Sequence, residues 1–223
     1  LLLARPEGIV LVTGPTGSGK TTTLYSILNH MNTEEVNIMT MEDPVEYPMA
    51  MIRQSSVNES ISMGFGEGIR SMMRQDPDII LVGEIRDAVT AEMAFRAAMT
   101  GHRVFSTLHT NSAIGAMPRL LDIGVLPDLI ASNLIGVISQ RLVRNLCKQC
   151  KVEREITPTE RKLLALTEGS PHKTLFHPVG CPACDNHGYK GRSSIIEILK
   201  ITAELDDLIR NGLAQAGTQP ARF

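Results

Sequence analysis

Short apolar runs alternate with helical patterns along the first two thirds of the chain. Runs rich in β-branched residues predict buried strands, and apolar positions that recur every three or four residues predict amphipathic helices. The expected strands are 9–13, 36–41, 78–82 and 103–107. The expected helices are 21–31, 66–74, 88–100, 112–123 and 127–145. This alternation predicts an α/β fold with a mainly parallel sheet flanked by helices.

Individual residues predict where some of these helices begin and end. Asp87 is suited to cap the N-terminus of the helix that follows it, and Gly101 is suited to end that helix. Pro118 lies inside the expected helix 112–123. That helix therefore either begins near Met117, with Pro118 in its first turn, or is kinked.

A glycine-rich loop joins the first expected strand to the first expected helix. Residues 14–21 read Gly-Pro-Thr-Gly-Ser-Gly-Lys-Thr and fit G-x-x-x-x-G-K-[ST], the phosphate-binding loop. Such a loop turns backbone N–H groups toward phosphate oxygens, with Lys20 on the β- and γ-phosphates and the Thr21 hydroxyl on Mg²⁺. The alternative is a glycine-rich turn with no ligand. The expected nucleotide-binding residues are Gly14, Pro15, Thr16, Gly17, Ser18, Gly19, Lys20, Thr21 and Thr22.

Acidic residues follow the second and third expected strands, at the strand ends where open α/β sheets bind ligands. Glu42, Asp43 and Glu46 follow the second strand. A carboxylate there could deprotonate the water that attacks a γ-phosphate, or the segment could be a solvated acidic turn. Glu84 follows the third strand, where an acid can face Mg²⁺ or the attacking water. Gly83 stands where an Asp is usual, so Glu84 is expected to act through water.

Two histidines flank the fourth expected strand. His109 and Thr110 follow it, and a hydrogen-bonding pair there could sense whether a γ-phosphate is present. His102 comes before the strand, directly after a helix, and the residue pattern favours a place at the negative end of that helix dipole.

The composition restricts the class of protein. The chain has 223 residues, 43% of them hydrophobic, and a net charge of −2. This length supports one core, or a core with a small lobe. The apolar run 129–138 is far shorter than the roughly 20 residues of a membrane span, so a cytoplasmic protein is expected. The first residue is not Met, and we expect a fragment of a longer protein.

Four cysteines form two close pairs, Cys147 with Cys150 and Cys181 with Cys184. Each C-x₂-C pair can supply two thiolates to a tetrahedral Zn²⁺, and a closed Cys₄ site is structural. Two disulfides or four free thiols are the alternatives. Residues 157–160 predict a capped helix between the pairs. We expect an ATPase core at 1–145, a zinc-binding subdomain at 146–187, and a segment at 188–223 that packs back on the core as a strand or a helix.

In this order the motifs resemble those of the type II/type IV secretion ATPase superfamily. The chain is similar to the C-terminal motor domain of a type IV pilus assembly ATPase or a type II secretion ATPase. The resemblance extends from Gly8 to Leu199. It rests on the Walker A loop at 14–21, the Asp box at 42–46, the Walker B region at 74–87, the His box at 101–110, the two cysteine pairs, and residues 188–192.

The resemblance implies a RecA-like fold and a homohexameric ring that hydrolyses ATP. Glu46 matches the general base of the family, Glu84 its Walker B glutamate, and His102 and His109 its paired histidines. Gly83 is usual in the family. The zinc lobe favours pilus assembly or secretion over pilus retraction. The implied partners are an inner-membrane platform protein and cytoplasmic assembly proteins, with the ring peripheral to that membrane. A DNA-uptake or conjugation ATPase is the alternative within the superfamily.

Two other functions are disfavoured by the residues. No Asn-Lys-x-Asp element for guanine occurs in the chain, which argues against a GTP-dependent switch. A zinc module that binds nucleic acid is disfavoured by the near-neutral charge and by the few aromatic residues, three Tyr, five Phe and no Trp. We expect no nucleic-acid partner.

Overall fold

The computed structural model describes residues 2–58, 60, 63–167 and 169–213. The chain divides into two compact units. The first comprises Leu1–Arg141 with Ile196–Phe223, and the second is Leu142–Ile195. Because compactness alone does not define a domain, the expected division into three segments at 145 and 187 stays a prediction.

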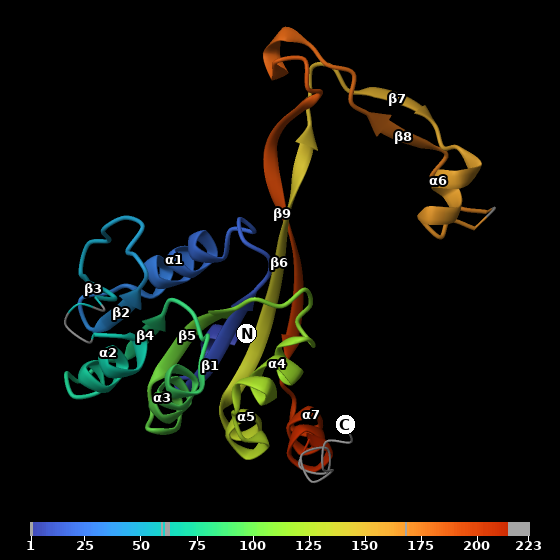
Figure 1. The fold of residues 1–223 in the computed structure, drawn as a ribbon. Helices are drawn as coiled ribbons and strands as arrows, with labels where there is room; N and C mark the ends of the chain where they lie inside the picture. Colours follow the sequence, from blue (N-terminus) through green and yellow to red (C-terminus); the bar gives the residue numbers. More distant parts are fainter. Residues whose placement is uncertain (1, 59, 61–62, 168, 214–223) are drawn as a thin grey trace. The chain divides into compact units, whose positions relative to one another are not determined.

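The first unit is built on a mainly parallel sheet, which confirms the predicted fold class. The sheet has seven strands in the order β3-β2-β4-β5-β1-β6-β9, of which β6 and β9 include residues of the second unit (Figure 1). Thr13 at the end of β1 pairs with Leu108 at the end of β5, so these two parallel strands end at one edge of the sheet. Thr13 also pairs with Ser139 of β6, and β6 continues beyond that edge to Leu146. The strands are β1 (Gly8–Thr13), β2 (Ile38–Glu42), β3 (Ile52–Ser56), β4 (Ile79–Val82), β5 (Arg103–Leu108), β6 (Leu134–Leu146) and β9 (Tyr189–Lys200).

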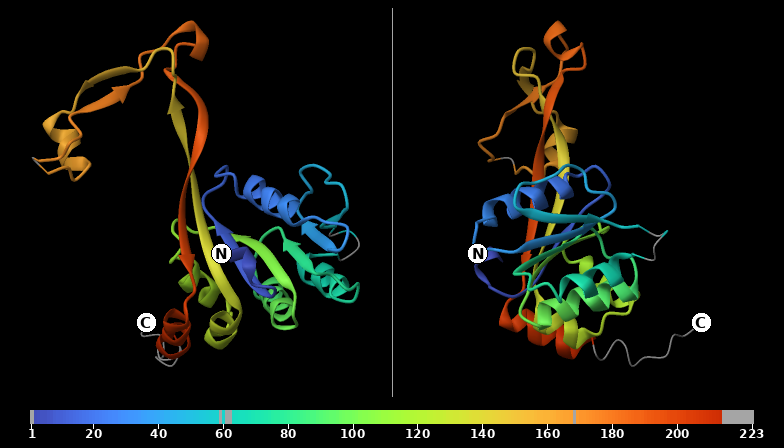
Figure 2. Two further views of the ribbon diagram at one scale, coloured as in Figure 1. Left: turned by 180° about the vertical axis from the view of Figure 1, so that it is seen from behind. Right: turned by 90° about the vertical axis from the view of Figure 1, so that its left-hand side faces the viewer.

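Helices cover both faces of this sheet (Figure 2). Val10 and Val12 of β1 pack with apolar residues of α1, whereas Ile9 and Leu11 point to the other face and pack with residues of α2 to α5. A strand buried on both faces explains the continuous apolar run in the sequence. The helices are α1 (Lys20–Met31), α2 (Phe65–Met72), α3 (Ala88–Met99), α4 (Ala116–Ile123), α5 (Pro127–Asn133) and α7 (Ala203–Leu208).

The second unit contains a small antiparallel hairpin. Strand β7 (Val152–Glu155) pairs with β8 (Thr174–His177), and helix α6 (Pro158–Leu163) lies between them in sequence. The capping box predicted for α6 is confirmed, because the Thr157 side chain accepts from the Glu160 N–H and the Glu160 side chain accepts from the Thr157 N–H. The short helical turn Pro182–Cys184 carries the second cysteine pair.

The predicted ends of two helices are confirmed. The Asp87 carboxyl group accepts a 2.8 Å hydrogen bond from the Thr90 N–H at the start of α3, and Gly101 follows α3 with φ of 96°. Helix α4 begins at Ala116, so Pro118 lies in its first turn and the kinked alternative is wrong.

One predicted helix is wrong over most of its length. The segment 127–145 forms a short helix, α5, and then the long strand β6. Residues 134–137 of β6 are all buried, and an apolar run buried on both faces cannot be distinguished from a buried helix by its periodicity. The sequence did not predict strand β3, because Ile52 is its only buried residue and the strand has no apolar run. Of the two alternatives for residues 195–199, the strand is confirmed as part of β9.

Among the helices of the described residues, none combines the length and the apolar character that a membrane crossing requires.

Candidate functional site

The glycine-rich loop occupies the turn between β1 and α1. Gly14, Gly17 and Gly19 all have positive φ, at 142°, 75° and 88°. A Cβ on Gly14 would lie 2.2 Å from the carbonyl oxygen of Gln140, so only glycine fits there. Gly19 is the N-cap of α1 and no side chain caps that terminus. The first amides of α1 are thus left to an acceptor from outside the helix, which fits a phosphate group.

The Lys20 side chain lies across this loop. Its Nζ donates to the carbonyl oxygens of Gly14 at 2.9 Å and Pro15 at 3.2 Å. Burial lowers the pKa of Lys20, and the nearby Glu84 carboxyl group opposes that effect. The loop lysine and the acidic residue after β4 therefore lie within electrostatic reach of each other.

Glu84 joins two further side chains at this edge of the sheet. One carboxyl oxygen contacts the Arg86 guanidinium, and the other lies 3.3 Å from Nε2 of His109. The Glu84 side chain is 12% exposed, whereas those of Arg86 and His109 are 63% and 52% exposed. The hydrogen bond with the Glu84 carboxyl group raises the pKa of Arg86. Lys20, Glu84 and His109 therefore lie near one another, as predicted, and Arg86 joins them.

A pair of threonines fixes the segment that follows β5. The Thr13 Oγ1 accepts a 2.9 Å hydrogen bond from the Thr110 N–H, and the two hydroxyl groups lie 2.7 Å apart. This contact ties the end of β1, directly before the phosphate loop, to the segment that carries His109. Thr110 thus positions a neighbouring residue, while its expected role as a sensor of γ-phosphate stays a prediction.

Glu46 lies in the segment that follows β2. Its backbone N–H donates to the Tyr25 hydroxyl oxygen at 3.3 Å, which sets the segment beside α1. The Glu46 side chain is exposed and makes no hydrogen bond or ion pair with Lys20, Glu84 or His109 in the described part of the chain. Its role as general base stays a prediction.

The two histidines that the resemblance pairs lie at opposite edges of the sheet, and the expected role of His102 at the nucleotide stays a prediction. His109 follows β5 at the phosphate-loop edge, whereas His102 precedes β5 at the opposite edge. There the His102 Nδ1 lies 3.0 Å from the Ala97 carbonyl oxygen, and its own carbonyl accepts from the Gly8 N–H at 3.2 Å. His102 therefore occupies the place at the end of α3 that the helix dipole favours.

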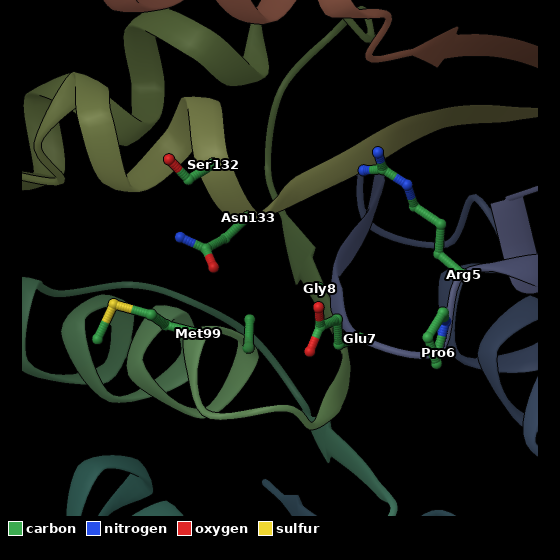
Figure 3. Close-up of a pocket in the computed structure, with 8 residues that line it drawn as sticks. Arg5, Pro6, Glu7, Gly8, Met99, Ser132 and Asn133 are labelled. Atoms are coloured by element: carbon green, nitrogen blue, oxygen red, sulfur yellow. The ribbon is translucent and has the colours of Figure 1, made fainter.

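A pocket of about 240 Å³ lies at this opposite edge (Figure 3). None of the expected nucleotide-binding residues lines it. The Glu7 carboxyl group and the Asn133 amide group face the same space in Figure 3. The lining residues are Arg5, Pro6, Glu7, Gly8, Ala98, Met99, Ser132 and Asn133.

The four cysteines converge in the second unit, with all four sulfur atoms within 4.8 Å of one another. The Sγ atoms of Cys147 and Cys181 are 3.9 Å apart, and those of Cys150 and Cys184 are 3.7 Å apart. Tetrahedral Zn–S bonds of about 2.3 Å imply S···S separations of roughly 3.8 Å, whereas a disulfide requires about 2.05 Å. The geometry fits a metal site, and the disulfide alternative is wrong.

Backbone amides favour the thiolate form at this cluster. The Gly188 N–H donates to the Cys184 sulfur at 3.2 Å and the Cys181 N–H does so at 3.3 Å. Burial raises the pKa of Cys184, but these donors and the neighbouring thiols outweigh burial and lower it to about 7. Burial raises the pKa of Cys181 to about 11. A bound metal ion deprotonates its thiol ligands in either case.

Comparison with known proteins identifies the family. The profile described as "Type II/IV secretion system protein" matches residues 1–221. The chain belongs to this family.

Two curated relatives with different functional names are similar to this chain. The chain is 50% identical over 216 residues to the type II secretion system protein E of Dickeya dadantii (strain 3937), covering 97% of the chain and 43% of the relative. It is 51% identical over 232 residues to the type IV pilus assembly ATPase TfpB of Acinetobacter baylyi (strain ATCC 33305 / BD413 / ADP1), covering 100% of the chain and 40% of the relative. The chain thus spans less than half the length of these relatives.

Solved structures of similar ATPases share the fold. The pilus retraction motor PilT with bound ADP matches with a TM-score of 0.70 and 34% identity, over 97% of this chain and 54% of that one. The Legionella pneumophila ATPase DotB matches with a TM-score of 0.65 and 26% identity, over 98% of this chain and 54% of that one.

Two residues at the site of this secretion-family chain, Gln140 and Arg86, were not predicted from the sequence. Gln140 donates from Nε2 to the Ser18 carbonyl at 2.8 Å and accepts from the Thr23 hydroxyl at 2.7 Å, so it contacts both the phosphate loop and helix α1. It was missed because its segment was predicted as a helix. Arg86 was missed although it stands two residues after Glu84, a spacing that turns alternate side chains of an extended segment to one face.

Proposed function

We propose that this chain is the nucleotide-binding motor region of an ATPase that powers type II protein secretion or type IV pilus assembly. The observation that carries this proposal is the convergence of Lys20, Glu84 and His109 beside the phosphate loop. These residues follow three neighbouring strands of the sheet, β1, β4 and β5. The names of the relatives support the choice of machine, and the ADP named with PilT supports an adenine nucleotide.

The phosphate loop binds the nucleotide, and the acidic residues around it act on the attacking water. The amides of residues 17–21 and the Lys20 ammonium group bind the phosphate chain, and the Thr21 hydroxyl holds Mg²⁺, which neutralises phosphate charge when bound. Glu46 orients and deprotonates the attacking water. Glu84 supports the water network, and its contacts with Arg86 and His109 couple the nucleotide to both side chains.

The wider assembly is part of the same proposal. In the full-length protein, subunits form a homohexameric ring in the cytoplasm, peripheral to the inner membrane, and contact a platform protein there. Closure of the ring around Mg-ATP performs mechanical work on that platform. The four cysteines hold a structural Zn²⁺ that takes no part in catalysis.

A Glu84→Gln substitution in the full-length protein tests this function. Glutamine keeps the shape of the side chain but loses the charge that attracts Arg86 and Lys20. We expect ATP to bind with an affinity within threefold of the wild type, while kcat for phosphate release falls by roughly 100-fold. Binding is measured by titration with a fluorescent ATP analogue, and turnover by phosphate release in steady state.

Glu7→Gln is the matched control, because it makes the same change at the opposite edge of the sheet. Its kcat should equal that of the wild type. Normal turnover by the Glu84→Gln protein would show that Glu84 has been assigned wrongly. A full-length wild-type protein that releases no phosphate from Mg-ATP would overturn the proposed function itself.

A further inference from the structure

The segment that carries Glu46 is held by side chains from two neighbouring elements. Among the described residues, four hydrogen bonds join side chains to the backbone of the segment 43–49, and three of them involve β3. The Val45 N–H donates to Ser56 Oγ at 3.2 Å, the Met49 N–H donates to Gln54 Oε1 at 2.6 Å, and Gln54 Nε2 donates to the Tyr47 carbonyl at 3.3 Å. The fourth is the bond from the Glu46 N–H to the Tyr25 hydroxyl. The position of Glu46 therefore depends on β3 and α1.

Tyr25 connects this segment to the phosphate-loop helix. It lies on α1, five residues after Lys20, and it is 1% exposed. Its hydroxyl donates to the Glu42 carboxyl group and accepts from the Glu46 N–H and from Gln54 Nε2, both at 3.3 Å. Burial, and then the hydrogen bond to Glu42, raise the pKa of Tyr25. The hydroxyl therefore keeps its proton and remains a donor at neutral pH.

Glu42 differs from the other two acidic residues of its segment. Asp43 and Glu46 are exposed, whereas Glu42 is 4% exposed. Its oxygens accept from the Tyr25 hydroxyl, from Thr40 Oγ1 at 2.6 Å and from Gln54 Nε2 at 3.3 Å. A carboxyl group enclosed by three protein donors is not available to an attacking water. Glu42 is suited to hold its neighbours in place.

We infer that Tyr25, Glu42 and Gln54 form a positioning cluster that sets Glu46 relative to the phosphate-loop helix. The inference rests on the proposed function, because it gives the cluster the task of placing the general base. None of the three is among the expected nucleotide-binding residues. They act through the backbone of the segment 43–49. The Tyr25 hydroxyl joins that segment to α1 by its hydrogen bond with the Glu46 N–H.

A Tyr25→Phe substitution in the full-length protein tests the cluster. Phenylalanine keeps the buried ring but removes the hydroxyl that accepts from the Glu46 N–H. We expect kcat for ATP hydrolysis to fall about tenfold, with KM and the affinity for a fluorescent ATP analogue within threefold of the wild type. A residue needed only for folding would lower the amount of active protein and the melting temperature, but active-site titration would show normal turnover per nucleotide-binding site.

Tyr47→Phe is the matched control. Its ring meets the Tyr25 ring edge-on with centroids 4.7 Å apart, and phenylalanine keeps that contact. Within the described residues the Tyr47 hydroxyl has no hydrogen-bond partner, and its loss should leave kcat unchanged. Gln54→Ala serves as a second variant if Tyr25→Phe does not fold, since Gln54 is only half-buried. It removes the bonds to Tyr47 and Met49 and should also lower kcat with little change in KM.

The outcomes separate this inference from the proposed function. Wild-type kcat per site in both Tyr25→Phe and Gln54→Ala would overturn the positioning cluster while leaving the ATPase intact. An equal loss of kcat in Tyr47→Phe would also overturn it, because the effect would not be specific to the Tyr25 hydroxyl. Absence of hydrolysis by the wild-type protein would instead refute the ATPase function on which the inference rests.

Discussion

A Lys20→Ala substitution in the full-length protein is expected to lower kcat/KM for ATP by about 1,000-fold, which corresponds to roughly 4 kcal/mol of transition-state stabilisation. The Lys20 Nζ already lies inside the loop, bonded to the carbonyls of Gly14 and Pro15. An ammonium group held there meets the negative charge that spreads over the phosphate oxygens during transfer. Alanine removes that charge together with the two hydrogen bonds to the loop carbonyls.

The measurement is phosphate release over a range of ATP concentrations, together with a nucleotide titration. Lys190→Ala is the matched control, since it removes the same group from an exposed position in the second unit. It should behave as the wild type does. If Lys20→Ala bound and hydrolysed ATP normally, the loop would be a glycine-rich turn and not a phosphate site.

Loss of zinc is expected to unfold most of the second unit. Among its described residues only Cys147, Cys184 and Gly188 are buried, whereas Leu163 and Phe176 are exposed. The unit thus has no hydrophobic core of its own to offset its conformational entropy. Structural zinc contributes on the order of 10 kcal/mol in small zinc domains. Metal binding should therefore account for nearly all of the stability of this unit.

Elemental analysis of the full-length protein should give one zinc ion per chain. Cys184→Ser should lose that ion, and hydrogen exchange should accelerate across residues 146–188. Ala183→Ser is the matched control, because it adds a hydroxyl group to the same knuckle and keeps all four thiols. A metal-free protein with slow exchange across this region would show that the four cysteines are free thiols without a structural role.

The sequence predicted those parts of the site that depend on strand ends. In a parallel sheet, residues that follow neighbouring strands share one edge. Because strands β1, β4 and β5 were predicted correctly, Lys20, Glu84 and His109 were expected together and lie together. The same rule separates His102 from them, because it precedes its strand. The resemblance to a family pairs His102 with His109, and that role of His102 stays a prediction.

The parts that sequence could not predict depend on contacts between distant segments. Gln140 holds the phosphate loop across 122 residues of sequence, and its strand has the apolar pattern of a buried helix. Gln54 belongs to β3, which has a single buried residue and gives almost no strand signal. Tyr25 occupies an apolar position of α1 and its hydroxyl has no sequence signature. Buried polar networks of this kind are set by tertiary structure.

The most direct test of the central claim is a structure of the full-length Glu84→Gln protein with Mg-ATP. We expect the phosphate chain in the loop 14–21, with the γ-phosphate in hydrogen-bonding contact with Lys20 and at the edge of the sheet that carries residue 84 and His109. A nucleotide bound at the opposite edge, between Glu7 and Asn133, would contradict the account.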